Sequence, residues 1–299
     1  MTLNLPSSRR WRAALMSLVL PGFGQLYNGR PNRAIWLFLS LALLSVPALA
    51  WIGVRLPAAL TLPALTASVL ASLGIWGFSV VDAWRDAADA ATRPRQAWQS
   101  GGVYALVFLA CNGLVLPLAI DHVRLHHVAS WRIPSDSMTP GILRGDILFA
   151  DMRYNCPGCG RAVKRGDVAI FTYPNDRTLS YIKRIIGLPG DRVRIDGRVV
   201  SVNGQPLGAG PDGQGLASET IDGRTWRVRW SDDEAGASIE RVVPPGAVFV
   251  LGDNRAHSRD SRHFETVPLR DVVGLARQVW FSKVPGGEVR WSRFGHVIE

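Results

Sequence analysis

Uncharged apolar residues dominate the first 120 positions of the chain, and short alternating runs replace them afterwards. Three segments, 35–54, 56–81 and 101–120, carry no charge and are each about 20 residues or longer. A helix of this length crosses roughly 30 Å of hydrocarbon, and a backbone exposed to lipid must close its own hydrogen bonds. The pattern therefore predicts a multi-spanning α-helical membrane region over residues 35–120.

Residues 1–34 form an N-terminal segment in which residues 13–29 are also uncharged. Pro and Gly near position 21 interrupt that stretch, so a secretory signal core, a re-entrant segment and a marginal span all remain open. A cleaved signal is disfavoured, because Gln25–Gly29 is not a small-residue cleavage site. The run Pro21–Pro31 is similar to a short motif of small multi-spanning membrane proteins, and no function follows from it.

Arginines in the short loops predict the orientation of the membrane region. Arg85, Arg93 and Arg95 lie between the second and third spans, whereas Arg55 alone lies between the first and second. Because positive loops stay in the cytoplasm, the chain after the third span lies outside. We expect a multi-pass protein of the inner (plasma) membrane whose C-terminal part is extracytoplasmic. In a bacterium with two membranes this side is periplasmic, and otherwise it is the cell surface.

The second half of the chain has the pattern of a mainly β domain over residues 131–284, after a linker at 121–130. Its apolar runs are short, rich in β-branched or aromatic residues, and bounded by Gly, Pro, Asn and Asp. The predicted strands are 146–150, 167–171, 193–195, 199–202, 226–230, 248–251 and 272–276. Residues 207–245 suggest a surface hairpin or cap of no readable function, and residues 285–299 a C-terminal tail on the surface.

The net charge of +10 comes mostly from arginine. Nucleic acid is one partner for such a chain, but no long basic run gathers the charge. Arginines beside apolar segments instead set membrane orientation and contact anionic headgroups. The lipid bilayer is therefore the expected partner, and nucleic acid is not.

Three cysteines add little chemistry. Cys111 lies inside an apolar segment and is expected to be an inert small hydrophobe. Cys156 and Cys159 form a lone pair with no second pair to complete a structural zinc site. Outside the cytoplasm a disulfide is the simplest state, while a partial metal site and free thiols stay open.

Two serines, Ser135 and Ser137, follow the last apolar segment, and a serine hydroxyl needs a base to become a nucleophile. No histidine stands in a hydrolase signature with a serine, so lysine is the other candidate. In a strand, Lys183 and Arg184 point to opposite faces, so one cation can be buried while the other meets solvent. The alternative is an ordinary exposed pair, since lysine is rarely buried.

Three blocks in this half resemble the type I signal peptidases, membrane-bound Ser-Lys endopeptidases. Residues 134–138 match the pattern P-S-x-S-M, and residues 183–191 match K-R-x-x-G-x-P-G-D. Residues 252–262 match G-D-N-R-x-x-S-x-D-S-R. The blocks occur in the family's order after membrane spans, and the resemblance covers roughly residues 131–283.

The resemblance implies a catalytic role for three of these residues. Ser137 would be the nucleophile, and Lys183 the general base, kept neutral by burial. The Ser135 side chain and the Ser137 backbone N–H would form the oxyanion hole.

The resemblance implies supporting roles for four more residues. Ser258 would orient the lysine amine, Asp260 and Arg262 would form an ion pair near the site, and Met138 would pack beside the nucleophile. One departure is Glu265, which stands where the family usually has glycine shortly after the last block, and it puts the local backbone packing in doubt.

The function implied is removal of signal peptides from exported preproteins, cut after an Ala-x-Ala-type motif, with no metal and no organic cofactor. Two alternatives remain: a specialised Ser-Lys peptidase that processes pilin-like precursors, and an inactive membrane β module that binds signal segments or a partner.

Overall fold

The computed structural model describes residues 6–90, 93–155, 162–231 and 238–298, which form two compact units. Unit 1 holds most residues up to Leu125, and unit 2 holds the chain from His126 onward. The boundary between the units falls inside the expected linker at 121–130, but most of that range is helix or strand. Helix continues to His126 and a strand begins at Val128, because no Gly or Pro interrupts residues 121–127.

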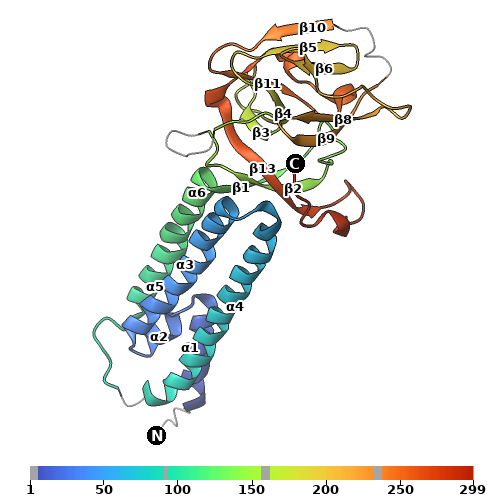
Figure 1. Ribbon diagram of the computed structural model, residues 1–299. Helices are drawn as coiled ribbons and strands as arrows, with labels where there is room; N and C mark the ends of the chain where they lie inside the picture. Colours follow the sequence, from blue (N-terminus) through green and yellow to red (C-terminus); the bar gives the residue numbers. More distant parts are fainter. Residues whose placement is uncertain (1–5, 91–92, 156–161, 232–237, 299) are drawn as a thin grey trace. The chain divides into compact units, whose positions relative to one another are not determined.

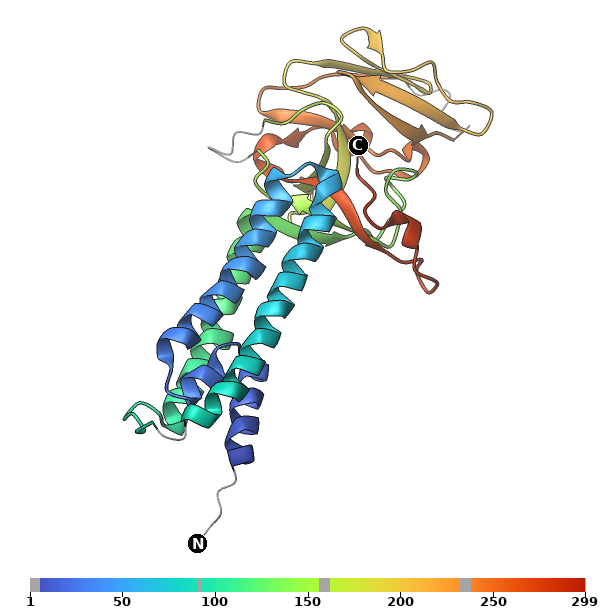
Figure 2. The same cartoon turned by 60° about the horizontal axis from the view of Figure 1, so that its bottom comes forward.

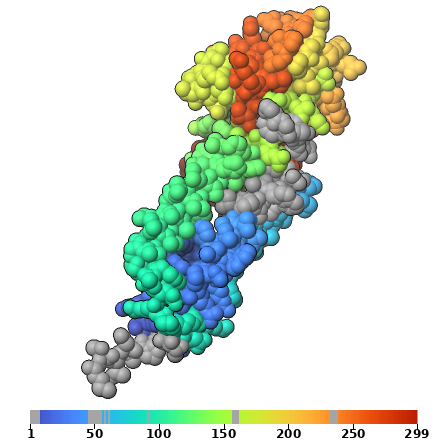
Figure 3. Space-filling view, turned by 90° about the vertical axis from the view of Figure 1, so that its left-hand side faces the viewer, coloured from blue at the N-terminus to red at the C-terminus, as the bar shows by residue number. Residues whose placement is uncertain are grey.

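Unit 1 is helical (Figure 1). Its elements are α1 (Pro6–Val19), α2 (Phe23–Tyr27), α3 (Pro31–Arg55), α4 (Ala58–Asp89), α5 (Gly101–Ala110), the π-helical turn η2 (Cys111–Val115) and α6 (Leu116–His126). The long helices run alongside one another in both cartoon views (Figure 2). The continuous helix from α5 to α6 has no buried residue, and the space-filling view shows it at the surface of this unit (Figure 3).

In the part of the chain that the structure describes, two helical stretches are long and apolar enough to cross a bilayer, Leu62–Asp89 and Gly101–His126. Length and composition alone identify them. The described apolar part of α3, Pro31–Leu44, is shorter. The span expected at 35–54, and with it a multi-spanning membrane region, therefore stays a prediction.

The segment 13–29 is divided between α1 and α2, and α2 is tied to α4. The Gln25 side-chain amide donates to the Ser79 carbonyl over 2.8 Å, and that of Asn28 donates to the Ala83 carbonyl over 2.8 Å. A Cβ on Gly24 would lie 2.1 Å from the Ala13 carbonyl oxygen. The Pro21–Pro31 motif thus serves close helix packing in this unit.

Unit 2 is mainly β, as predicted, and its described strands pair antiparallel. They form a seven-stranded sheet in the order β1-β2-β13-β3-β4-β11-β12, a four-stranded sheet β10-β5-β6-β7 and the hairpin β8-β9. The strands are β1 (Val128–Arg132), β2 (Asp146–Asp151), β3 (Val168–Thr172), β4 (Ser180–Gly187), β5 (Arg192–Asp196), β6 (Val199–Val202), β7 (Gln205–Pro206), β8 (Leu216–Ile221), β9 (Arg224–Arg229), β10 (Ser238–Val242), β11 (Ala247–Leu251), β12 (Val267–Pro268) and β13 (Val272–Ser282).

The strand β11 is buried on both faces and joins two of the cores. Phe249 and Leu251 pack with the small sheets, whereas Val248 and Val250 pack with Phe171 on the other side. A continuous apolar run is what a strand covered on both faces requires. This strand leads directly into the block 252–262 and fixes where that block begins.

Two segments are more integrated than the sequence indicates. Within 207–245, Trp226 and Val228 of the hairpin are buried in the core of the small sheets. The tail 285–299 folds back, and Arg293 places its guanidinium on the carboxylate of Asp146 at 2.6 Å. Asp146 is fully buried, so the tail supplies the counterion of an interior acid rather than a loose surface end.

Candidate active site

Ser137 lies in the loop after β1, and its backbone is held from two sides. Its neighbour Met138 is fully buried in the core that contains Ile133, consistent with the packing role expected of it. The Asn254 backbone N–H donates to the Ser137 carbonyl over 3.1 Å, and the Asn254 side chain donates to the Asp136 carbonyl over 3.0 Å. The hydroxyl of Ser137 is therefore presented from a fixed backbone.

Lys183 lies on β4, where it pairs with Ala169 of β3. Its side chain is buried, with 4% of the residue exposed, and its Nζ lies 2.8 Å from the Ser137 Oγ. The same amine donates to the Ile182 carbonyl over 2.9 Å. Two residues 46 positions apart in sequence are thus within hydrogen-bond reach.

Burial lowers the pKa of Lys183 to about 8, because dry surroundings disfavour the ammonium, while the carboxylates of Asp260 and Asp253 oppose this lowering. Roughly a tenth of such an amine is neutral at pH 7. The neutral form can accept a proton, so the site contains a base beside a hydroxyl.

The expectation that Lys183 and Arg184 divide between interior and solvent is wrong. Arg184 is 3% exposed, and its guanidinium binds the Asp253 carboxylate with two hydrogen bonds of 2.8 and 2.7 Å. It also lies over the Trp226 ring, 4.6 Å from the centroid. The hairpin covers that second face of β4, and the sequence gives no sign of this because the covering residues lie 40 positions later.

Ser135 is exposed, and its Oγ lies 3.3 Å from that of Ser137. The expected i, i+2 relation therefore places both hydroxyls on one side of the chain. A hydroxyl in this place is within reach of an oxyanion formed beside Ser137, so the role expected of Ser135 stays a prediction.

The ion pair expected of Asp260 and Arg262 is present, at 2.9 Å, with the carboxylate fully buried. Burial favours the protonated acid, but the Arg262 guanidinium and the Gly252 backbone N–H hold the pKa of Asp260 below its ordinary value. Ser258 is buried next to this ion pair, and its hydroxyl also helps to hold the pKa of Asp260 down. A Cβ on Gly252 would lie 2.1 Å from the Ser258 Oγ, so close packing there requires glycine.

Asp253 and Asn254 belong to the site although no role in positioning was expected of Asn254. Asp253 neutralises Arg184, and Asn254 anchors the nucleophile loop. Both lie within the matched block 252–262, which was the available signal. Their partners lie 69 and 118 positions away, so only the fold could identify them.

The cysteine pair Cys156 and Cys159 lies outside the described residues. Among the residues that are described, no group of three or more His, Cys, Asp or Glu side chains could hold a metal ion. Cys111 lies in η2, where it is half-buried.

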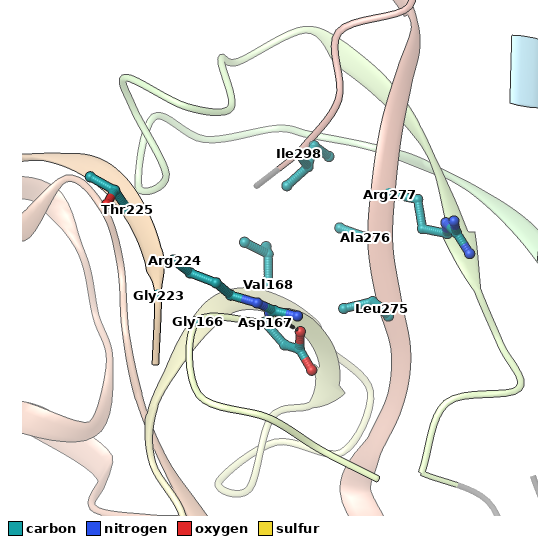
Figure 4. Close-up of a pocket in the computed structure, with 10 residues that line it drawn as sticks. All are labelled: Gly166, Asp167, Val168, Gly223, Arg224, Thr225, Leu275, Ala276, Arg277 and Ile298. Carbon is teal, nitrogen blue, oxygen red and sulfur yellow. Dashed lines mark hydrogen bonds and ion pairs between the residues drawn. The ribbon is translucent and has the colours of Figure 1, made fainter. Parts of the chain in front are cut away.

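A cavity of about 470 Å³ lies in unit 2, and its wall does not include the candidate catalytic residues (Figure 4). Arg224 and Thr225 of the hairpin line one side of it, and Leu275 and Ala276 of β13 line another. Neither Ser137 nor Lys183 contributes to its wall. The cavity is therefore separate from the candidate site.

A buried lysine amine within reach of a serine hydroxyl, on a mainly β domain, is typical of a serine peptidase with a lysine base. A protein family described as signal peptidase, peptidase S26, matches residues 106–281, more than half of the chain. The chain belongs to this family. The predicted family and enzyme class are thereby confirmed.

Individual relatives agree with this assignment. A signal peptidase I of Pseudomonas fluorescens is 35% identical over 185 residues, which cover 52% of this chain and 65% of that protein. One of Rickettsia canadensis is 28% identical over 224 residues, covering 62% and 80%. A crystal structure of a signal peptidase I from Enterococcus faecalis is 26% identical over 38% of this chain and 97% of its own, with a TM-score of 0.27. That score is too low to establish a shared fold.

Proposed function

We propose that this protein is a membrane-anchored endopeptidase that removes signal peptides from exported preproteins with a Ser137–Lys183 dyad. The observation that carries the proposal is the 2.8 Å approach of a buried amine to the serine hydroxyl. Catalysis by this pair needs no metal or organic cofactor.

The first half of the reaction forms an acyl-enzyme. Ser137 Oγ attacks the scissile carbonyl carbon while the neutral Lys183 Nζ takes the hydroxyl proton. The ammonium then gives this proton to the leaving amine, and the peptide bond breaks. In the second half Lys183 takes a proton from water, whose oxygen attacks the acyl carbon. The bond to Ser137 Oγ then breaks, and the ammonium returns the proton to this leaving oxygen.

Ser135 and the Ser137 backbone N–H are proposed to donate to the oxyanion in both halves. Each donor of this kind contributes about 3 to 4 kcal/mol once bound substrate excludes water from it. Ser258 is proposed to orient the amine, and the burial of its hydroxyl in the block 252–262 supports this role. Asp260, Arg262 and Met138 are proposed to hold the surrounding backbone.

The substrate is proposed to carry an Ala-x-Ala-type cleavage site after an apolar segment. That segment lies in the same bilayer as the peptidase, which raises its effective concentration at the site. The proposal places the protein in the inner membrane as a multi-pass protein, with unit 2 on the periplasmic side. The positive loop after α4 supports this orientation.

Replacing either member of the dyad tests the mechanism. Ser137→Ala and Lys183→Met should each lower kcat for cleavage of a preprotein by about 10³-fold or more. Lys183→Met should remain folded. Burial lowers the pKa of Lys183 from 10.5 to about 8, which corresponds to a cost of about 3 kcal/mol for the ammonium at pH 7, and the methionine side chain avoids this cost. Lys283→Met, at an exposed lysine, is the matched control and should retain full activity.

Substantial cleavage by a folded Ser137→Ala variant would refute the dyad. Comparing generic preproteins with pilin-like precursors decides the substrate class. If no precursor acylates Ser137, as followed by mass spectrometry, the chain is a binding module instead.

A further inference from the structure

The hairpin β8–β9 buries an acid inside an apolar core. Its inward positions alternate along both strands, with Ala217 and Glu219 buried on β8 and Trp226 and Val228 buried on β9. Glu219 is 3% exposed and pairs across the hairpin with Trp226. A carboxylate in such surroundings is costly unless it is fully paired.

The partner of Glu219 is Arg255, 36 positions later in the matched block. The guanidinium binds the carboxylate with two hydrogen bonds of 2.7 and 2.5 Å, and its side chain is fully buried. The Trp226 indole also donates to Glu219, over 3.2 Å, and the Trp230 ring lies 5.1 Å from the guanidinium. The pair is therefore enclosed by the hairpin and the chain that follows it.

Arg255 also binds other residues of the loop 252–262, which lies beside Ser137 and Lys183. Its Nε donates to the Gly252 carbonyl over 2.9 Å, and its own carbonyl accepts from Arg262 over 2.7 Å. Arg262 in turn binds Asp260, which accepts from the Gly252 N–H over 3.0 Å. The loop 252–262 is thus closed on itself around the Arg255 side chain.

The same loop touches the nucleophile on its other side. Asn254 donates to the carbonyls of Asp136 and Ser137, and a Cβ on Gly252 would lie 2.5 Å from the Ser137 carbonyl oxygen. A displacement of this loop by a fraction of an ångström would therefore move the serine.

Two further contacts hold the hairpin against the main sheet. The Arg229 backbone N–H donates to the Asp253 carbonyl over 2.8 Å. At the other end of β9, Arg224 forms an ion pair with Asp167, next to the cavity of Figure 4. The hairpin is thus fixed at both ends, and Glu219 acts from a rigid element.

We propose that Glu219 and Arg255 are positioning residues. Their ion pair holds the loop 252–262 against the β8–β9 hairpin, and this loop in turn holds the backbone of Ser137 in place. This inference rests on the proposed function, since it concerns the geometry of the same serine and lysine. It assigns a role to the segment 207–245, for which the sequence suggests none.

Stability alone does not account for this pair. A buried ion pair replaced by apolar residues of similar volume is often neutral or more stable, whereas removing one partner leaves a buried charge uncompensated. The two kinds of variant therefore separate folding from positioning.

The decisive variant is the double substitution Glu219→Leu/Arg255→Met in the full chain, assayed in detergent with a synthetic signal peptide carrying an Ala-x-Ala site. We expect a thermal midpoint at or above that of the wild type, with kcat lowered about 10- to 100-fold and KM within twofold. The pH profile of kcat/KM should also move, because Asp260 moves relative to Lys183. A folded double variant with wild-type kcat and pH profile overturns the inference.

Glu219→Asp provides a second test that keeps both charges but draws the carboxylate back by one methylene. We expect about a tenfold loss of kcat with the protein folded, and wild-type kcat here overturns the inference even if the double variant fails to fold. Glu240→Gln removes one partner of the exposed Arg192–Glu240 pair in the neighbouring sheet and should change nothing.

Ser137→Ala distinguishes the two proposals. If Ser137→Ala is inactive while the double variant has full activity, only the positioning role fails. If Ser137→Ala remains active, the dyad itself fails.

Discussion

Lys183 is under opposing electrostatic influences within a few ångströms. Burial favours its neutral amine, while Asp260 and Asp253 favour the ammonium. Burial prevails, and the pKa falls to about 8 rather than staying at 10.5. The amine of Lys183 therefore changes charge near pH 8, inside the pH range of an ordinary activity assay.

The pH dependence of cleavage follows from this value. Only the neutral amine accepts a proton, so kcat/KM should rise about tenfold per pH unit below about 8 and level off above it. Initial rates between pH 5.5 and 9.5 measure this curve. The free energy of unfolding should also rise with pH. The pKa of Lys183 is lower in the folded state, so the cost of burying the ammonium disappears as pH rises from about 8 toward 10.5. A rate independent of pH across this range would contradict the assigned base.

At the scale of elements, the short helix α7 (Ser261–Phe264) ends at Glu265, whose backbone has φ 67° and ψ −128°. A residue with a Cβ is strained in this conformation, and glycine is not. The sequence marks the same position as a departure from the family, which usually has glycine there. The expected disturbance of backbone packing thus takes the form of a strained helix end.

Substituting Glu265 should relieve this strain. Glu265→Gly is expected to raise the free energy of unfolding by about 1 kcal/mol, or the thermal midpoint of unit 2 by about 2 to 4 °C. Glu265→Ala removes the same carboxylate but keeps a Cβ, so it should give no gain. Equal midpoints for the two variants would show that the strain is absent.

The predicted strands correspond to β2, β3, β5, β6, β9, β11 and β13, because alternation and turn residues are local signals. Their order was not predictable. β13 pairs with both β2 and β3, and no local pattern indicates a partner more than 100 positions away. For the same reason Ser137 and Lys183 could be found from their blocks, while the contacts of Arg184 and Glu219 could not.

At the scale of the whole molecule, the two units have separate cores, which allows them to be disturbed separately. Gly24 of unit 1 has no room for a side chain, since a Cβ would meet the Ala13 carbonyl at 2.1 Å and the Ala83 Cβ at 2.7 Å. Substituting Gly24 should therefore destabilise the helices of unit 1 and leave the geometry of Ser137 and Lys183 unchanged.

Gly24→Ala should destabilise unit 1 by about 1 to 3 kcal/mol through overpacking. Thermal melts followed by helical circular dichroism should shift downward, while cleavage of a soluble peptide at low temperature should stay at the wild-type rate. Gly74→Ala is the matched control, because no atom lies within 4 Å of its Cβ position in α4. Its melt should be unchanged or higher. Identical melts for both variants would exclude the tight contact at Gly24.

The pairing of β3 with β4 has a consequence of its own. Side chains alternate along a strand, so a slip of a single residue would bring Arg184 to the place of Lys183. A guanidinium does not lose its proton in a protein, and the serine would then face a cation unable to act as a base. The register between these strands therefore decides whether the serine faces a group that could act as its base.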